Sequence, residues 1–417
     1  MNKQSIAFFA LGLCQTFACT ADRAEINDTG TGLGPINSDG DGDGDGDGDG
    51  DGDGDGDGDG DGDGDGDGDG DGDGDPPNDC GEIDIVPTLI PPNLMLVLDK
   101  SGSMVSNTWD HDNDNPDGSG CLTDGITAST PEVTRWNSLY AVTEDILGQF
   151  DASINFGMQL FPSMEACACY DERACVVEST PEVAVAANTG SQVMIVLPGP
   201  DSTSDDISGG TPATAGINSA IDHLLDLDDE NDRYILFITD GAANCTEGLE
   251  DGELLEVYDS SLPTAVAQGL AQSVSTFVVG IDILNQVLGA GVDGAPEANA
   301  FASLNEVAEA GGQAKEGNEK FYNVANESEL DDALKLIAGE IQQCDMALDP
   351  LPGLEQVPYV RFSDQNEEAI PLVDDCESED GWTWITLGEH VEFCGTYCSD
   401  FKSGAGFKGV YGCPPAL

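Results

Sequence analysis

The stretch that most constrains the fold of this chain is residues 94–104, LMLVLDKSGSM. Five consecutive apolar residues, 94–98, are followed at once by the oxygen-bearing side chains of Asp99, Ser101 and Ser103. A continuous apolar run that ends in polar turn residues is typical of a buried strand in a parallel sheet. Oxygen side chains on a loop at a strand's carboxyl end suit a small divalent cation. The stretch therefore predicts a buried strand that ends in part of a metal site.

Further strands and helices alternate along the chain. Apolar runs predict buried strands at 154–161, 234–239, 276–281 and 320–324. Apolar residues at helical spacing predict helices at 129–150, 212–225, 262–272, 297–310 and 328–343. Strands that alternate with helices are typical of an α/β fold with a parallel sheet.

The composition changes after Cys344. Pro350, Pro352 and Pro358 interrupt any helix, and short β candidates lie at 359–362, 383–387 and 389–393. Five cysteines fall in this part: Cys344, Cys376, Cys394, Cys398 and Cys413. A segment this short cannot bury a large core, so we predict a small disulfide-rich β module at 344–417.

The first 19 residues have the pattern of an export signal, with Lys3 followed by an apolar run at 6–13. The run is too short to span a bilayer. Residues 16–19 (TFAC) resemble the cleavage box of bacterial lipoproteins, in which the cysteine, here Cys19, is lipidated. The alternative is an ordinary secretory signal cut near Ala21. The 13 cysteines also favour an oxidising compartment. We expect an outer-membrane or surface lipoprotein held to the membrane by its anchor only, or otherwise a secreted protein.

Residues 20–80 form the predicted linker, which contains an Asp-Gly alternation at 39–75. This repeat has no apolar side chains to bury, so we expect a disordered tether. Loose calcium binding by its aspartates is the alternative interpretation. The whole chain carries a net charge of -70 with only 12 Lys and Arg. Binding to nucleic acid is therefore excluded, because phosphate contacts need clustered basic side chains.

Two segments insert between the predicted elements. Asp110, Asp112 and Asp114 keep the first spacings of an EF-hand calcium loop, which would make an additional Ca²⁺ site. Asn115 replaces the required glycine, however, and Cys121 stands where the closing glutamate belongs, so a solvated acidic loop is the competing interpretation. The second segment is rich in cysteine at 167–175, and we expect disulfides there with partners that the sequence does not give.

Three motifs together resemble the metal-ion-dependent adhesion site (MIDAS) of the von Willebrand factor A-type (VWA) family. They are Asp-x-Ser-x-Ser at 99–103, Gly-Thr-Pro at 210–212 and Thr-Asp-Gly at 239–241. The chain is therefore similar to bacterial secreted and lipoprotein members of that family. The resemblance implies a doubly wound, mostly parallel sheet with helices on both faces at 81–343. It places the motifs on three neighbouring loops.

The resemblance also assigns roles to the site residues. It implies that Ser101 and Ser103 bind the metal through their hydroxyls and that Thr211 binds directly or through water. Asp99 and Asp240 would hold waters and balance charge. The ion would be Mg²⁺, or Ca²⁺ or Mn²⁺, with a coordination position left for an acidic side chain of a protein or surface polymer.

These features predict a cell-surface adhesion-type protein that binds its partner through a divalent metal. Two alternatives remain, a structural envelope protein with a purely stabilising metal and a non-catalytic assembly subunit of a larger complex. For one loop alone, Asp and Ser could simply cap the following turn. An enzyme is not expected, because His111, His223 and His390 lie in no nucleophile or zinc motif.

The export signal generates a direct test. Cells that express the full chain and grow with labelled palmitate should yield labelled protein, because several acyl chains on Cys19 would anchor it stably. Cys19→Ser should abolish the label, and Cys14→Ser should leave it unchanged. An unlabelled wild-type protein would rule lipidation out.

Overall fold

The computed structural model describes residues 83–106, 108–109, 133–249, 251–287, 296–342, 344–353, 356–376, 378–402 and 405–412. The export signal with Cys19, the Asp-Gly repeat and the acidic loop with Asp110, Asp112 and Asp114 lie outside these residues. The interpretations of those segments therefore remain predictions.

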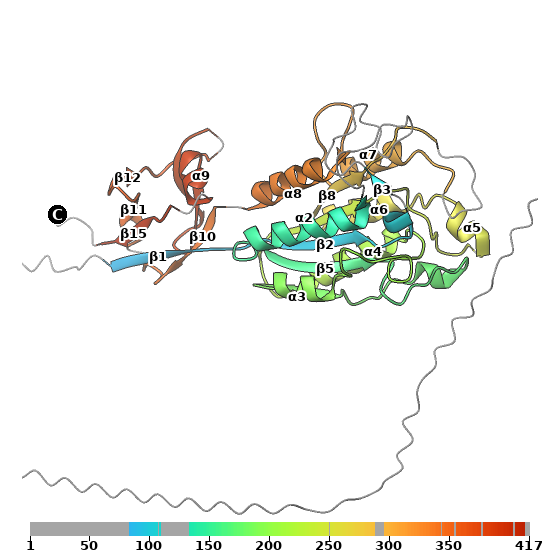
Figure 1. The fold of residues 1–417 in the computed structure, drawn as a ribbon. Coiled ribbons are helices and arrows are strands. Elements are labelled where there is room, and N and C mark those ends of the chain that lie inside the picture. Colours follow the sequence, from blue (N-terminus) through green and yellow to red (C-terminus); the bar gives the residue numbers. More distant parts are fainter. Residues whose placement is uncertain are drawn as a thin grey trace, which may run out of the picture. The chain divides into compact units, whose positions relative to one another are not determined.

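A six-stranded sheet holds the predicted central strand (Figure 1). Its order is β6 (Val183–Ala186), β5 (Asn155–Phe161), β2 (Asn93–Asp99), β7 (Arg233–Thr239), β8 (Val274–Ile281) and β9 (Tyr322–Val324). The last five run parallel to one another, whereas β6 pairs antiparallel with β5. All residues of β2 are buried, as the continuous apolar run predicts.

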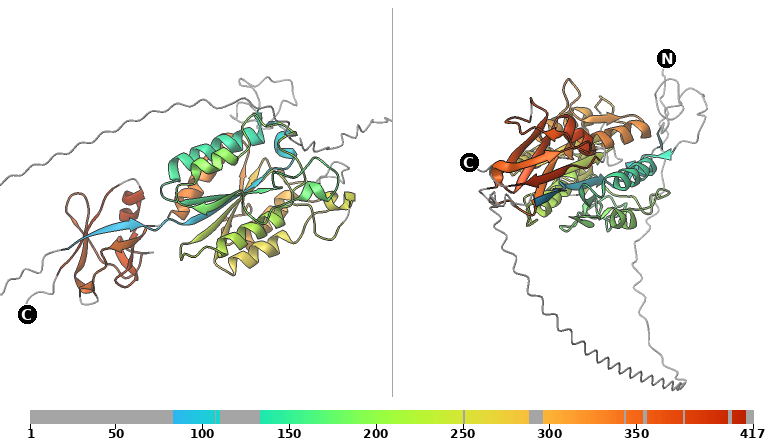
Figure 2. Two further views of the ribbon diagram at one scale, coloured as in Figure 1. Left: turned by 90° about the horizontal axis from the view of Figure 1, so that it is seen from below. Right: turned by 90° about the vertical axis from the view of Figure 1, so that its left-hand side faces the viewer.

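Helices pack on both faces of this sheet (Figure 2). Side chains of α2 (Arg135–Phe150) and α8 (Glu327–Ile341) share one core with Leu94, Leu96 and Leu98. The alternate residues Met95 and Val97 belong to a second core with α4 (Ala213–Leu225), α6 (Leu262–Leu270) and α7 (Ala300–Ala310). Shorter elements are α1 (Ser103–Ser106), β3 (Thr108–Trp109), β4 (Val133–Thr134), a 3-10 turn (Glu172–Cys175), α3 (Gly190–Val196) and α5 (Asp251–Glu256).

The second sheet is larger and wholly antiparallel. Its seven strands run in the order β12 (Ala369–Ile370), β11 (Val360–Ser363), β15 (Lys408–Tyr411), β1 (Ile83–Leu89), β10 (Asp345–Asp349), β14 (His390–Cys394) and β13 (Gly381–Thr386). A 3-10 turn (Val357–Tyr359) precedes β11, and α9 (Thr396–Lys402) follows β14.

The two edges of this second sheet approach each other. The chain just after β12 bonds to β13, because Val373 N–H donates to Trp382 O at 2.9 Å and Trp382 N–H donates to Pro371 O at 2.9 Å. The sheet is therefore a nearly closed barrel. Its core is aromatic, with Phe362 packed edge-on against both Trp382 and Phe393.

These sheets correct the predicted fold class. A doubly wound, mostly parallel sheet with a small C-terminal β module was the wrong description, because the larger sheet is the antiparallel barrel and the other sheet is mixed. The sequence analysis placed 83–89 inside the α/β domain predicted at 81–343 and assigned it no strand. In the structure this segment is β1, which pairs with β15 through its first half and with β10 through its second. Those partners lie more than 250 residues along the chain, so no local pattern reveals them.

The expectation of disulfides in both predicted segments is confirmed for the described cysteines, whereas Cys413 lies outside the described residues. Cys344–Cys398 and Cys376–Cys394 lie in the C-terminal part, and Cys167–Cys169 and Cys175–Cys245 involve the cysteine-rich segment. Cross-links of this kind restrict the unfolded chain and so favour the folded state.

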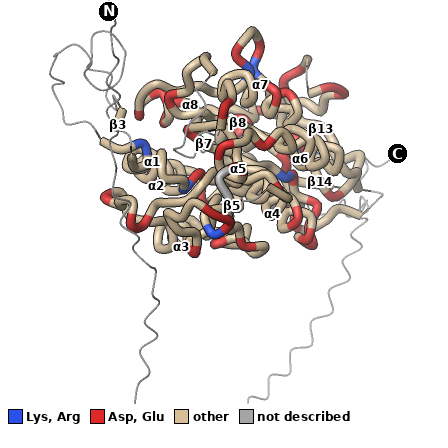
Figure 3. The backbone as a smooth tube through the Cα atoms, turned by 90° about the vertical axis from the view of Figure 1, so that its right-hand side faces the viewer, with Lys and Arg blue, Asp and Glu red and all other residues tan. Residues whose placement is uncertain are grey.

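Acidic residues outnumber basic ones along the described chain. Figure 3 shows Asp and Glu on loops and helices throughout, with few Lys and Arg among them. Within the described residues, no helix is both long and apolar enough to cross a bilayer.

His223 ties α4 to the edge strand β6. Its Nε2 accepts a hydrogen bond from Val185 N–H at 3.0 Å, which requires an unprotonated nitrogen. Burial lowers the pKa of His223, and the nearby Asp226 partly opposes this effect. The neutral ring is therefore the form that the fold favours.

This contact predicts a pH-dependent stability. A histidine whose pKa is lowered by folding contributes fully above its unfolded pKa of about 6.5, and the contribution is lost as the pH falls through the folded value. Between pH 7.5 and 5 the wild type should lose more unfolding free energy than His223→Gln, by up to about 1 kcal/mol after solvent screening. Denaturant unfolding measures this, and parallel pH profiles would contradict the assignment.

Candidate metal site at the carboxyl ends of the parallel strands

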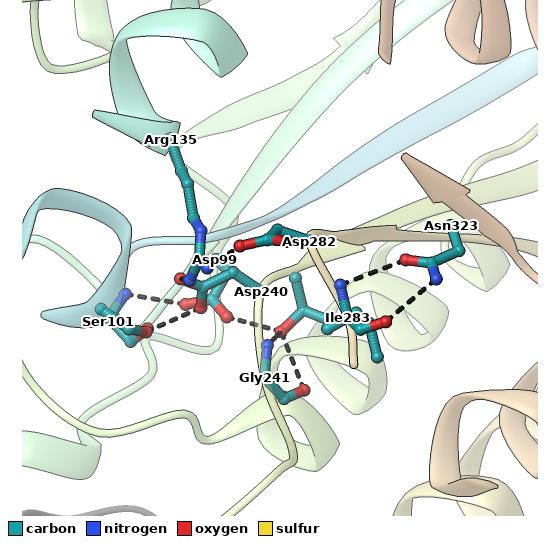
Figure 4. A network of polar contacts seen from close by, with 10 residues as sticks. Asp99, Ser101, Arg135, Asp240, Gly241, Asp282, Ile283 and Asn323 are labelled. Atoms are coloured by element: carbon teal, nitrogen blue, oxygen red, sulfur yellow. Dashed lines mark hydrogen bonds and ion pairs between the residues drawn. The ribbon is translucent and has the colours of Figure 1, made fainter. Parts of the chain in front are cut away.

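Asp99 is the deepest residue of the candidate site. It ends β2 and is fully buried. Its Oδ1 accepts the N–H of Ser101 at 2.8 Å, and its Oδ2 accepts the hydroxyl of Thr239 at 2.6 Å (Figure 4). Because β2 and β7 are parallel neighbours, their carboxyl ends lie at the same edge of the sheet. The carboxylate is therefore fixed from two strands.

Hydroxyl groups join Asp99 to Asp240. The Ser103 hydroxyl donates to Asp240 Oδ1 at 2.7 Å, and the Ser101 and Ser103 hydroxyls lie 2.9 Å apart. Asp240 follows the last residue of β7, and its side chain has no exposed area. Four of the five predicted metal ligands thus form one connected set of oxygens.

Thr211, the fifth predicted ligand, is buried on the loop before α4. A backbone contact brings this loop to the others, since Gly102 N–H donates to Gly209 O at 3.3 Å. All three predicted loops therefore meet at one end of the six-stranded sheet.

The electrostatics of the pair Asp99 and Asp240 favour a cation. Burial, followed by the charge of Asp240, raises the pKa of Asp99 to about 7, although hydrogen bonds from Thr239 and Ser101 oppose the shift. Two buried carboxylates so close together repel each other unless positive charge separates or neutralises them.

The donor set fits a hard divalent cation. Two carboxylates and three hydroxyls are all oxygen donors, which suit Mg²⁺, Ca²⁺ or Mn²⁺ better than a thiolate-preferring metal. Across the described ranges, no group of three or more His, Cys, Asp or Glu is arranged to hold a metal. Any metal bound here would therefore depend on the serine and threonine oxygens.

Arg135 is a site residue that the sequence analysis missed. It is the first residue of α2, where Thr134 caps the helix. Its Nη1 donates to Asp240 Oδ2 at 2.8 Å, and its Nη2 donates to Asp282 Oδ2 at 2.6 Å (Figure 4). No local motif marks Arg135 or Asp282, because each contacts the site from an element more than 40 residues from Asp240 along the chain.

Asn244 is a second residue that the sequence analysis missed. Its Oδ1 accepts Thr211 N–H at 2.6 Å, and its own N–H donates to Thr211 O at 3.0 Å. Its Nδ2 donates to Leu255 O at 2.9 Å, so all polar atoms of the buried side chain are engaged. Asn244 therefore holds the backbone of Thr211 in place.

The Cys175–Cys245 disulfide supports the same loop. Gly210 N–H donates to Ala174 O at 2.9 Å, beside this disulfide. A Cβ on Gly210 would lie 2.8 Å from Cys245 Sγ and 2.9 Å from Asn244 Oδ1. Only glycine allows this close approach, so the cysteine-rich segment packs directly against the Thr211 loop.

The sequence matches no protein-family model and no curated protein.

Several solved structures resemble the chain weakly. The pilus adhesin SpaC from Lactobacillus rhamnosus GG has 12% identity and a TM-score of 0.43, over 78% of this chain and 39% of the adhesin. The conserved hypothetical protein BatB from Bacteroides thetaiotaomicron has 16% identity and a TM-score of 0.36, over 60% of this chain and 96% of that protein.

A third structure is proximal thread matrix protein 1 from the mussel byssus, described with a zinc-occupied MIDAS motif. It has 10% identity and a TM-score of 0.34, over 63% of this chain and 50% of that protein. Of the pilus adhesin named first, the chain spans only about two-fifths of the length. Likenesses at these TM-scores carry neither a function nor a site for this chain.

The Asn244 contacts generate a test. Asn244→Ala should weaken Mn²⁺ binding about tenfold. The substitution removes the hydrogen bond from Thr211 N–H to Asn244 Oδ1 and the bond from Nδ2 to Leu255 O that holds the side chain in place, each worth about 1 kcal/mol. Isothermal titration with the folded protein measures the affinity, and Asn366→Ala, on an exposed turn of the barrel, is the matched control. An Asn244→Ala affinity equal to that of the wild type would contradict this role.

Proposed function

We propose that this protein is a cell-surface binding protein of the adhesion type, which captures a partner through a divalent cation. The cation, Mg²⁺ or alternatively Ca²⁺ or Mn²⁺, would be held by Asp99, Ser101, Ser103, Thr211 and Asp240. The observation that carries the proposal is the connected set formed by Asp99, Ser101, Ser103 and Asp240, in which Ser103 bonds to Asp240 at 2.7 Å. The loop that carries the buried Thr211 meets this set through a backbone hydrogen bond.

The residues divide the work. Ser101, Ser103 and Thr211 offer neutral oxygens, so they can bind a cation without cancelling its charge. Asp99 and Asp240 supply the negative charge that keeps it there, and their hydrogen bonds to Thr239 and Ser103 fix their orientation. When bound, the metal supplies an electrophilic position that an incoming carboxylate can occupy.

The partner is a protein or surface polymer with an acidic side chain. The chain has 82 Asp and Glu against 12 Lys and Arg, so its field repels an acidic partner at long range. That repulsion is screened over about 8 Å at physiological salt. The partner's carboxylate should therefore stand among basic side chains, and the metal should be the local positive point that attracts it.

Export and anchoring complete the proposal. Lipidation of Cys19 would hold the protein on the outer membrane or cell surface, and the Asp-Gly repeat at 39–75 would act as the tether. The disulfides of the folded part support an oxidising location. Without lipidation, the same protein would be secreted.

The decisive test removes the metal and asks about both binding and folding. In Mg²⁺ this protein should capture a partner from an envelope extract. The capture should be abolished by EDTA and by Asp99→Ala, while the circular dichroism spectrum of this protein stays native. Mg²⁺ should also raise the melting temperature of the wild type but not of Asp99→Ala, because a ligand stabilises only the state that binds it.

Asp222→Ala, an exposed carboxylate on α4, is the control and should behave as the wild type. Capture that persists in EDTA would refute metal-dependent binding. Unfolding in EDTA would instead favour a purely stabilising metal, and co-purification of a fixed enzyme partner would favour an assembly subunit.

A further inference from the structure

Arg135 is the one cation that directly contacts a carboxylate of the candidate metal site within the described residues. Its guanidinium joins Asp240 and Asp282 at 2.8 and 2.6 Å, and its side chain is only 12% exposed. Asp240 has no exposed side-chain area, so solvent does not compete for this ion pair. Arg135 therefore acts on the site at short range and in poorly screened surroundings.

The position of Arg135 is unfavourable on local grounds. It is the first residue of α2, where the partial positive charge of the helix end disfavours a cation. Burying a guanidinium adds a desolvation cost. Two carboxylates, which follow the ends of β7 and β8, must offset both effects. A neutral residue at position 135 would need neither carboxylate. The arrangement thus has a cost that helix formation does not explain.

The two carboxylate oxygens of Asp240 accept hydrogen bonds from different partners. Oδ2 of Asp240 accepts from Arg135, whereas Oδ1 accepts from the Ser103 hydroxyl. One oxygen is thus committed to an internal cation, and the other faces the predicted metal ligands. The negative charge that Asp240 can offer a metal is correspondingly reduced.

Asp282 holds Arg135 from the other side and is itself supported. Asn323 on β9 accepts Ile283 N–H at 3.1 Å and donates to Ile283 O at 3.0 Å, which fixes the backbone next to Asp282 (Figure 4). The guanidinium is therefore part of a chain of contacts across β7, β8 and β9 rather than a loose side chain.

Lys100 does not duplicate this role. It is fully buried, and its Nζ has no hydrogen-bond partner among the residues that the structure describes. Burial lowers the pKa of Lys100, so its charge is the one more easily lost. Arginine, by contrast, stays protonated in proteins.

We propose that Arg135 is a built-in positive charge that limits how tightly the site binds its divalent cation and so leaves that cation receptive to a partner's carboxylate. This inference rests on the proposed function. With Asp240 partly neutralised by Arg135, the site supplies less charge than the metal carries. The bound ion keeps part of its positive charge for the incoming acidic group. Arg135 is a positioning residue in this scheme, because it acts through Asp240.

Binding of Mn²⁺ alone, measured by isothermal titration of the full chain, tests the proposal. Arg135→Gln should bind Mn²⁺ about tenfold more tightly than the wild type, because a nearby positive charge has been removed. Arg135→Lys keeps the charge and should stay within about threefold of the wild type. Asp282→Asn removes a negative charge, so the positive charge of Arg135 is balanced by Asp240 alone. This variant should therefore bind Mn²⁺ several-fold more weakly than the wild type.

Arg233→Gln is the matched control. Arg233 begins β7, whereas Asp240 follows its end, so the same charge is removed roughly 20 Å from the site and Mn²⁺ affinity should not change. Because Arg135 and Asp240 are largely buried, raising the salt concentration should leave the gain in Arg135→Gln largely unchanged.

The outcomes separate the two proposals. If the wild type binds no Mn²⁺, the proposed function and this inference both fail. If the wild type binds Mn²⁺ and Asp99→Ala does not, the proposed function stands. Affinity in Arg135→Gln that is then unchanged or weaker overturns the role of Arg135 alone. Should Arg135→Gln fail to fold, Asp282→Asn decides, and an unchanged affinity there overturns the inference.

Discussion

The close burial of two carboxylates, Asp99 and Asp240, is the constraint on which the rest of the site depends. Burial, together with the charge of Asp240, makes Asp99 costlier to ionise and raises its pKa to about 7. A chain selected only for stability would place a neutral residue at one of these positions. The hydroxyls of Thr239 and Ser103 and the guanidinium of Arg135 partly offset the cost. A divalent cation would offset this electrostatic cost further, so the cost itself is consistent with the proposed metal binding.

Parallel pairing of β2, β5, β7 and β8 brings the necessary groups together. Parallel neighbours end at the same edge of a sheet, so Asp99, Asp240 and Asp282 meet although they are far apart in sequence. The surrounding loops are then fixed by specific contacts. Asn244 and the Cys175–Cys245 disulfide secure the Thr211 loop, and Asn323 secures the backbone beside Asp282. The segments that the sequence presents as insertions, above all the cysteine-rich one, thus act as supports for the site.

What the sequence could predict depended on how local the information was. The apolar run at 94–98 identified β2, because burial on both faces leaves a continuous apolar signal. The three loop motifs are short, and their positions at strand ends could be read directly. Arg135, Asn244 and Asp282 could not be found in this way, since their roles arise from contacts between distant elements. The barrel was missed for the same reason. β1 contains Pro87 and looks like a linker until its pairing with β10 and β15 is known.

The account makes one central claim, that oxygens from three loops bind a divalent cation. Anomalous scattering from a crystal of the protein grown in Mn²⁺ tests it most directly. We predict a single strong manganese peak beside the hydroxyls of Ser101 and Ser103, within about 2.2 Å of each, as expected for a small hard cation. The absence of a peak there, or a peak elsewhere in the protein with these hydroxyls unliganded, would contradict the claim.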